Sequence, residues 1–188
     1  MTDQEFINYL ESSPNSEWYK VLSCRDGKYL GAMKYIIENK PKFTLEYGGG
    51  RSTYVLTLLI NELNYGGKII GIEEVKEWWD HHNEDGSNEF NNIILVGDSI
   101  IEDDKFTYVH DLESYKDVDF VILDGPDYRA YGDRLGVTLN LKLLVDYIGK
   151  EIPYFIDGRE GCVKYYKKLG YTSEIPDIKN DGLRLSPL

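Results

Sequence analysis

The stretch FTLEYGGGRSTYVL, residues 43–56, places three consecutive glycines between a short apolar run and a Ser-Thr pair. Phe43–Tyr47 has the composition of a strand, and apolar residues at helical spacing predict a helix over Thr53–Leu63. Glycine is unfavourable inside both kinds of element. The run therefore predicts a tight turn between a strand and a helix, at which a ligand can approach the backbone closely.

The same alternation of strand and helix continues along the chain. Further strands are predicted at residues 68–74, 91–98, 118–125 and 153–158, and further helices at residues 74–82, 134–148 and 160–170. The segment VDFVILDG, residues 118–125, is almost continuously apolar, as is typical of a strand buried on both faces. Repeated strand–helix–strand units predict an α/β fold with a doubly wound, mostly parallel sheet and helices on both faces.

The ends of the chain complete a single domain over residues 1–188. Residues 1–40 are expected to form N-terminal helices, and residues 41–188 the core. Thr2 and Glu5 form a capping box ahead of a helix of about ten residues. A second helix is predicted over Lys28–Asn39, and residues 171–176 with 181–187 predict an antiparallel C-terminal hairpin.

Composition excludes several classes of partner. The net charge is −12, and no run of Lys and Arg is longer than two, so nucleic acid is a poor candidate. No apolar stretch approaches the roughly 20 residues that span a bilayer, and the polar, acidic start does not have the pattern of a signal peptide. Cys24 and Cys162 form no metal or disulfide pattern and indicate free thiols in a reducing, cytoplasmic compartment.

Acidic residues close the predicted strands. They lie in five short segments: Glu46-Tyr47-Gly48, Glu73-Glu74, Gly97-Asp98, Asp124-Gly125 and Asp157-Gly158. Ligands of doubly wound sheets bind outside the carboxyl ends of the strands. We therefore expect these acids to lie along one edge of the sheet, around a ligand site.

Two common uses of a glycine-rich turn do not fit. A dinucleotide-binding Gly-x-Gly-x-x-Gly motif that starts at Gly48 requires a third glycine where the chain has Thr53. A phosphate-binding P-loop requires Gly-Lys-Ser/Thr, which does not follow.

The turn instead resembles motif I of the class I S-adenosylmethionine-dependent methyltransferases, in the form Glu46-x-Gly48-x-Gly50-x-Ser52. Glu73 at the end of the second strand, Gly97-Asp98 after the third, and DFVILDGP around Asp124 are similar to later elements of that family. The resemblance runs from about residue 25 to residue 170 and implies a Rossmann-like fold that binds S-adenosylmethionine.

The resemblance also implies roles for single residues. The cofactor-binding residues would be Glu46, Gly48, Gly50, Ser52, Glu73, Asp98 and Ser99. The glycines would let the methionine moiety pass close to the backbone, and Glu46 would either hold its ammonium group or organise the turn. Glu73 would accept hydrogen bonds from the ribose hydroxyls, and Asp98 would lie near the adenine or cap the next turn.

Methyl transfer to a hydroxyl needs a proton acceptor beside the methyl group. The candidate catalytic residues are Asp124, Asp157 and His110, although a lone histidine in a polar loop is also typical of a surface residue. Asp124 and Asp157 at adjacent strand ends could alternatively share a divalent metal ion, with Asp127 as a third ligand.

The segment DGPDYRAYGDR, residues 124–134, together with FIDGR, residues 155–159, is similar to sugar methyltransferases of the glucuronoxylan 4-O-methyltransferase type. The chain departs from that type, which has His before the second Asp and Arg three residues after it. The resemblance implies a sugar or glycan hydroxyl as acceptor, with Tyr128, Arg134 and Arg159 as substrate-binding residues. Two alternatives stay open: a phenolic, amine or protein acceptor, and a non-catalytic cofactor-binding module.

Overall fold

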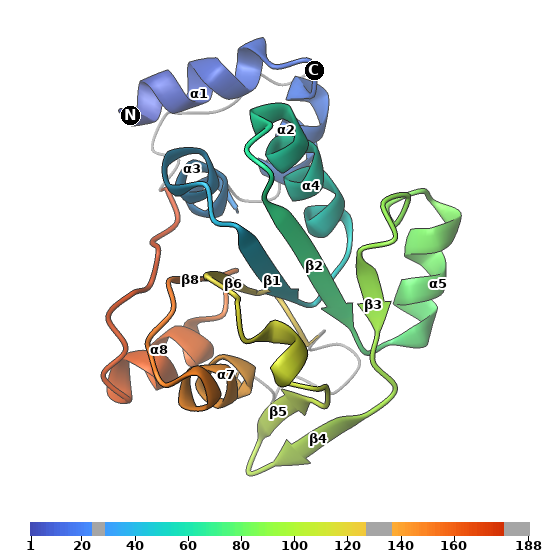
Figure 1. Ribbon diagram of the computed structural model, residues 1–188, viewed down its shortest axis with the longest axis vertical. Coiled ribbons are helices and arrows are strands. Elements are labelled where there is room, and N and C mark those ends of the chain that lie inside the picture. The colour runs from blue at the N-terminus through green and yellow to red at the C-terminus, as the bar shows by residue number, and fades with distance from the viewer. Residues whose placement is uncertain (24–28, 127–136, 179–188) are drawn as a thin grey trace.

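The computed structural model describes residues 1–23, 29–126 and 137–178, and a five-stranded parallel sheet lies at its centre (Figure 1). From edge to edge, the strands are β3 (Ile93–Leu95), β2 (Lys68–Glu73), β1 (Phe43–Tyr47), β6 (Phe120–Leu123) and β8 (Tyr154–Ile156). Every neighbouring pair is parallel. The first strand of the chain, β1, lies at the centre of the sheet, and later strands are added on both sides of it. This order confirms the predicted doubly wound α/β fold and is consistent with a Rossmann-like one.

Helices cover both faces of this sheet. They are α1 (Asp3–Ser12), α2 (Ser16–Ser23), α3 (Leu30–Asn39), α4 (Arg51–Leu63), α5 (Lys76–Glu84), α7 (Asn140–Ile148) and α8 (Glu160–Lys168). Successive residues of β6 enter opposite cores: Phe120 and Ile122 pack with α1–α4, whereas Val121 and Leu123 pack with α7 and α8. Burial on both faces explains why this strand is apolar throughout.

A second, smaller sheet was not predicted. It contains β4 (Ser99–Glu102), β5 (Lys105–Tyr108) and β7 (Val137–Thr138), with β4 antiparallel and β7 parallel to β5. A short 3₁₀ turn, Glu113–Tyr115, follows β5. In Figure 1 the β4–β5 ribbon lies beyond the carboxyl ends of β1 and β2. It therefore adds side chains at the edge of the central sheet where a ligand site is expected.

Several predicted boundaries need correction. The helix predicted over residues 134–148 begins at Asn140, because Val137 and Thr138 pair with β5 instead. Helix α2 was not predicted at all. Residues 171–176 contribute one isolated parallel bridge, between Glu174 and Tyr154, rather than a strand of a hairpin. The second half of that hairpin, residues 181–187, lies outside the described residues.

The capping box that the sequence predicts at the start of α1 is confirmed, and α8 ends in a motif that depends on a glycine. Thr2 and Glu5 exchange the two hydrogen bonds of a capping box at the start of α1. At the end of α8, Gly170 adopts φ +86°, and its N–H and that of Tyr171 donate to the carbonyls of Lys167 and Tyr166. This pair of bonds is a Schellman motif, which glycine favours because it needs a positive φ.

None of the helices in the described segments has the length and apolar character needed to cross a membrane. Cys162 is a buried free thiol, as predicted, whereas Cys24 lies outside the described residues.

Glu62 on α4 joins the N-terminal helices to the core. Its carboxylate accepts hydrogen bonds from the hydroxyls of Tyr9 (3.1 Å), Ser13 (2.6 Å) and Tyr19 (2.8 Å) and from the amide of Asn15 (3.0 Å). Burial by itself would raise the pKa of Glu62, but these four hydrogen bonds outweigh burial and lower it. The charged form of one side chain thus connects α1 and α2 to α4.

We predict that Glu62→Gln lowers the free energy of unfolding by about 2 kcal/mol at neutral pH, the usual size for lost hydrogen bonds to a charged group. A lowered folded-state pKa gives stability that is present above the ordinary pKa of a glutamate and lost as the pH falls through the folded value. The deficit should therefore shrink in acid. Urea unfolding of both proteins at pH 7 and pH 4 measures it, with the exposed Glu84→Gln as control; equal deficits at both pH values would contradict the prediction.

Candidate functional site

A cavity of about 570 Å³ opens at the carboxyl ends of the central strands. Its walls come from the turns after β1, β2, β6 and β8, from α2, α5 and the start of α4, and from β5. The lining residues are Val21, Leu22, Tyr29, Gly48, Gly49, Gly50, Arg51, Ser52, Glu73, Glu74, Trp78, His81, His82, Tyr108, Asp124, Gly125, Asp157 and Arg159. The volume lies within the range of about 300–1,000 Å³ that is typical of small-molecule sites.

The glycine turn packs directly on the turn after β6. Gly48 has φ +93°, and a Cβ atom there would lie closer than 3.0 Å to the backbone nitrogen of Gly125. The N–H groups of Asp124 and Gly125 both donate to the carbonyl of Tyr47. On the other side, a Cβ on Gly49 would lie 2.8 Å from the carbonyl carbon of Gly71 in β2. The first two glycines are therefore required by close backbone packing.

The third glycine has a different neighbour. A Cβ on Gly50 would lie 2.7 Å from Nε2 of His82, at the end of a side chain rather than at backbone. The ring of His82 stacks on Trp78, with centroids 6.5 Å apart, and both belong to α5. Burial lowers the pKa of His82. Trp78, His81 and His82 were not predicted as site residues, although they follow Glu73 directly and so had to lie near the same edge of the sheet.

Glu46 lies beneath the turn and is fully buried, so it does not line the cavity. Its carboxylate accepts hydrogen bonds from the hydroxyls of Thr53 (2.5 Å) and Tyr29 (2.8 Å). The Thr53 hydroxyl in turn accepts the N–H of Gly50 at 3.1 Å. Of the two roles expected for Glu46, these contacts match organisation of the turn.

Tyr29 connects Glu46 to the cavity. Its hydroxyl lies 2.8 Å from a carboxylate oxygen of Glu46 and 2.8 Å from one of Asp124, yet it has only one proton to donate. Burial, followed by repulsion from Asp124, raises the pKa of Glu46 to about 7. Glu46 is therefore partly protonated near neutral pH and can supply the second proton of this group. Tyr29 has a positive φ of 69°, an unusual backbone conformation for a tyrosine.

Glu73 ends β2 at the cavity wall, as predicted. One of its carboxylate oxygens accepts the backbone N–H groups of Glu74 (3.0 Å) and Val75 (2.8 Å), which fixes the side chain. Burial, followed by repulsion from Glu74, raises the pKa of Glu73 to about 8. The backbone thus sets the orientation of the Glu73 carboxylate through one oxygen, and its other oxygen remains to accept a hydrogen bond from a ligand.

The acids after β6 and β8 also meet at the cavity. Asp124 and Asp157 both line it, together with Arg159, whose guanidinium donates to the backbone carbonyl of Asp124. Two of the three predicted catalytic residues, Asp124 and Asp157, thus lie at the cavity together with Arg159, which was predicted to bind substrate. Tyr108 and Glu74 lie beside them and were not among the predicted site residues.

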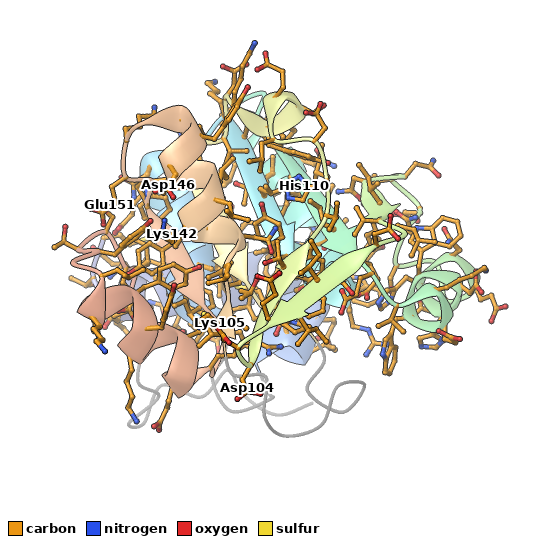
Figure 2. All side chains as sticks on the ribbon, turned by 90° about the horizontal axis from the view of Figure 1, so that it is seen from below. Asp104, Lys105, His110, Lys142, Asp146 and Glu151 are labelled. Atoms are coloured by element: carbon orange, nitrogen blue, oxygen red, sulfur yellow. The ribbon has the colours of Figure 1, made fainter. Side chains whose placement is uncertain are left out.

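Three predicted residues lie elsewhere. Asp98 and Ser99 are exposed and do not line the cavity, because β3 ends at Leu95 and the chain then turns into β4. His110, labelled in Figure 2, follows β5. Its Nε2 lies 3.0 Å from the Tyr47 hydroxyl and 3.4 Å from the side-chain nitrogen of Asn140 at the start of α7. Burial lowers the pKa of His110, but the residue is not part of the cavity wall.

The remaining predicted residues cannot be placed. Tyr128 and Arg134, expected to bind substrate, and Asp127, considered as a third metal ligand, lie outside the described residues. Among residues 1–23, 29–126 and 137–178, no group of three or more His, Cys, Asp or Glu side chains is arranged to hold a metal ion.

Comparison of the sequence with models of known protein families gives no match, and comparison with curated proteins gives none either.

We predict that Glu46→Gln changes how stability depends on pH. A folded pKa of about 7, raised from 4.5, means that the folded wild type binds an extra proton between these values and loses stability as the pH rises through them. The variant lacks this loss. Its free energy of unfolding should therefore improve relative to wild type by about 2–3 kcal/mol between pH 4 and pH 8.

Urea unfolding across that pH range measures the difference, with Glu84→Gln as the matched exposed control. A difference between Glu46→Gln and wild type that does not change with pH would show that Glu46 stays charged in the folded protein.

Proposed function

We propose that the protein is an S-adenosylmethionine-dependent O-methyltransferase that transfers a methyl group to a hydroxyl of a sugar or glycan. One observation carries the proposal: the glycine turn after β1, Glu73 at the end of β2 and Asp124 at the end of β6 line a single cavity. These three strands are neighbours in the sheet order β3-β2-β1-β6-β8. The resemblance in sequence assigns the cofactor to the glycine turn and to Glu73, and a catalytic role to Asp124.

The chemistry of the cavity supports this cofactor. A sulfonium and an ammonium group are favoured beside carboxylates, and Glu73, Asp124 and Asp157 are at hand. Gly48 and Gly49 leave the backbone bare where the methionine moiety would pass. The orientation of Glu73, held by two backbone N–H groups, leaves it able to accept the ribose hydroxyls. The residues present therefore fit the cofactor.

The adenine end needs a different assignment from the one the resemblance gave. Asp98 and Ser99 do not line the cavity, whereas the aromatic rings of Trp78 and His82 do. A flat base is well matched to aromatic faces. We therefore assign the adenine to the α5 wall, with His82 moving off Gly50 as the nucleoside enters.

When bound, the cofactor would supply an electrophilic methyl group. The protein must then hold the acceptor oxygen in line, about 3 Å from the methyl carbon, and keep water away. Asp124 is well placed for this, because Tyr29 orients its carboxylate and Arg159 binds its carbonyl. Asp124 and Asp157 remain the sequence-based candidates to accept the acceptor's proton; a metal ion between them would need further ligands.

We predict that, at pH 9, Glu73→Gln weakens S-adenosylmethionine binding by about 10–100-fold, since a pKa of about 8 leaves Glu73 charged at that pH and the change removes charge-assisted hydrogen bonds worth about 1.5–3 kcal/mol. Isothermal titration calorimetry of both proteins measures this, with the exposed Glu77→Gln of α5 as control. Failure of the wild type to bind at millimolar cofactor would refute the proposed cofactor altogether.

We predict that Asp124→Asn lowers methyl transfer at least 100-fold while the cofactor dissociation constant changes less than about fivefold, since its effect is on the reacting atoms. Labelled cofactor is incubated with glycans, phenols, amines and peptides, and the surface variant Asp146→Asn serves as control. Label on phenols or peptides alone would identify the alternative acceptors. Binding without transfer to any acceptor would favour the non-catalytic module. A second arm with a chelator tests for a metal.

A further inference from the structure

Three polar side chains at one corner of the cavity have atoms without a hydrogen-bond partner among the described residues. They are the hydroxyl of Tyr108, both carboxylate oxygens of Glu74 and Nε of Arg159, and all of these atoms are buried. A buried polar group left without a hydrogen-bond partner destabilises the protein. Such groups gathered on one wall of a cavity indicate a place where a ligand supplies the missing partners.

The Tyr108 hydroxyl is held firmly in this corner. Tyr108 is 1% exposed, and its ring packs against Tyr47 and Phe106 with centroids 5.4 and 4.8 Å away. The hydroxyl lies against Gly125, where any Cβ atom would collide with it. Because Gly125 follows Asp124 directly, this hydroxyl lies next to the position proposed for the transferred methyl group.

Arg159 and Glu74 complete the corner from two other elements. Arg159 donates through Nη2 to the carbonyl of Asp124, which fixes its guanidinium while Nε stays unpaired. Glu74 follows β2, and burial raises the pKa of its carboxyl group. The Tyr108 hydroxyl is close enough to Glu74 for the two to affect each other's pKa, but no hydrogen bond of ordinary geometry joins them.

We propose that Tyr108, Glu74 and Arg159 form the acceptor subsite and bind one uncharged sugar hydroxyl. This inference rests on the proposed methyltransferase function. A hydroxyl has one proton to donate and two lone pairs to accept hydrogen bonds. The corner offers the complementary set: a carboxylate that accepts, and an O–H and an N–H that donate.

The same set disfavours charged acceptors. An ammonium group has three donors and no lone pair, so it would leave the Nε–H of Arg159 without an acceptor. An anionic acceptor would meet more acids than cations among the described lining residues, which carry Glu73, Glu74, Asp124 and Asp157 against Arg51 and Arg159. Repulsion of this kind selects for an uncharged hydroxyl.

The subsite also provides a group that can accept the proton of the bound hydroxyl. As the bound hydroxyl oxygen forms its bond to the methyl carbon of the sulfonium donor, the carbon–sulfur electron pair stays on sulfur, and the hydroxyl proton passes to Glu74. The products are a methyl ether, a neutral thioether and a protonated carboxyl group. In this assignment Glu74 replaces Asp124 and Asp157 as the proton acceptor. Asp124 instead positions the groups around the reaction, because its backbone carbonyl binds Arg159 and its carboxylate contacts Tyr29.

The first test needs no substrate. Tyr108→Phe removes a hydroxyl that makes no hydrogen bond to any described residue, so its melting temperature should equal or exceed that of wild type. The matched variant Tyr47→Phe removes a hydroxyl that is bonded to His110 and should melt at a lower temperature. A Tyr108→Phe variant as destabilised as Tyr47→Phe would show that Tyr108 pairs with Glu74 internally and would overturn the proposal.

The second test uses methyl α-D-glucopyranoside as an uncharged probe. Its methylation by labelled cofactor is measured by mass spectrometry, and cofactor affinity is measured separately by calorimetry. We expect transfer to fall about 100-fold or more in Glu74→Gln and about 10-fold in Tyr108→Phe, with cofactor affinity within about twofold of wild type in both. The exposed Glu77→Gln should transfer normally.

The outcomes separate the two proposals. Variants that transfer at the wild-type rate, or that lose cofactor affinity as far as they lose transfer, would overturn the acceptor subsite and leave the cofactor proposal standing. So would a wild type that binds cofactor but does not methylate the glycoside. A wild type that binds no cofactor would instead remove the proposed function.

Discussion

The cavity depends on the backbone contact between the turns after β1 and β6. Asp124 and Gly125 both donate to the carbonyl of Tyr47, and Gly48 fits against Gly125 only because neither residue has a Cβ atom. A side chain at either position would force the turns apart. The contact thereby fixes Asp124 beside the glycine turn, in the wall of the cavity that the described residues line.

Burying several carboxylates around one cavity is costly, and the protein offsets the cost differently for each. Glu46 takes up a proton near neutral pH and receives two hydroxyls. Glu73 accepts hydrogen bonds from two backbone N–H groups, and Asp124 contacts the Tyr29 hydroxyl, which also contacts Glu46. Glu74 receives none of these among the described residues, which is why it is the carboxylate best prepared for a ligand.

The sequence predicted those strands and helices whose apolar residues form a regular pattern. Strands β1, β2, β6 and β8 are apolar runs, and acids at their carboxyl ends reach one edge by the geometry of a parallel sheet, so Glu73, Asp124 and Asp157 were found. The same rule was wrong for Asp98, because the third strand stops at Leu95. The end of a strand is set by its hydrogen bonds to its neighbour, which side-chain pattern alone does not reveal.

The residues that the sequence missed come from elements whose position is set by tertiary packing. Tyr108 belongs to a short strand of the second sheet, and Trp78 belongs to a helix in which no residue is fully buried, so neither pattern indicated where the ring would point. These two rings, rather than the glycine turn, make the walls of the cavity chemically different from one another: Trp78 lies on the α5 wall and Tyr108 on the β5 wall. Under the proposed function, the sheet would fix the position of the reaction, and the less regular elements around it would select the base and the hydroxyl that enter.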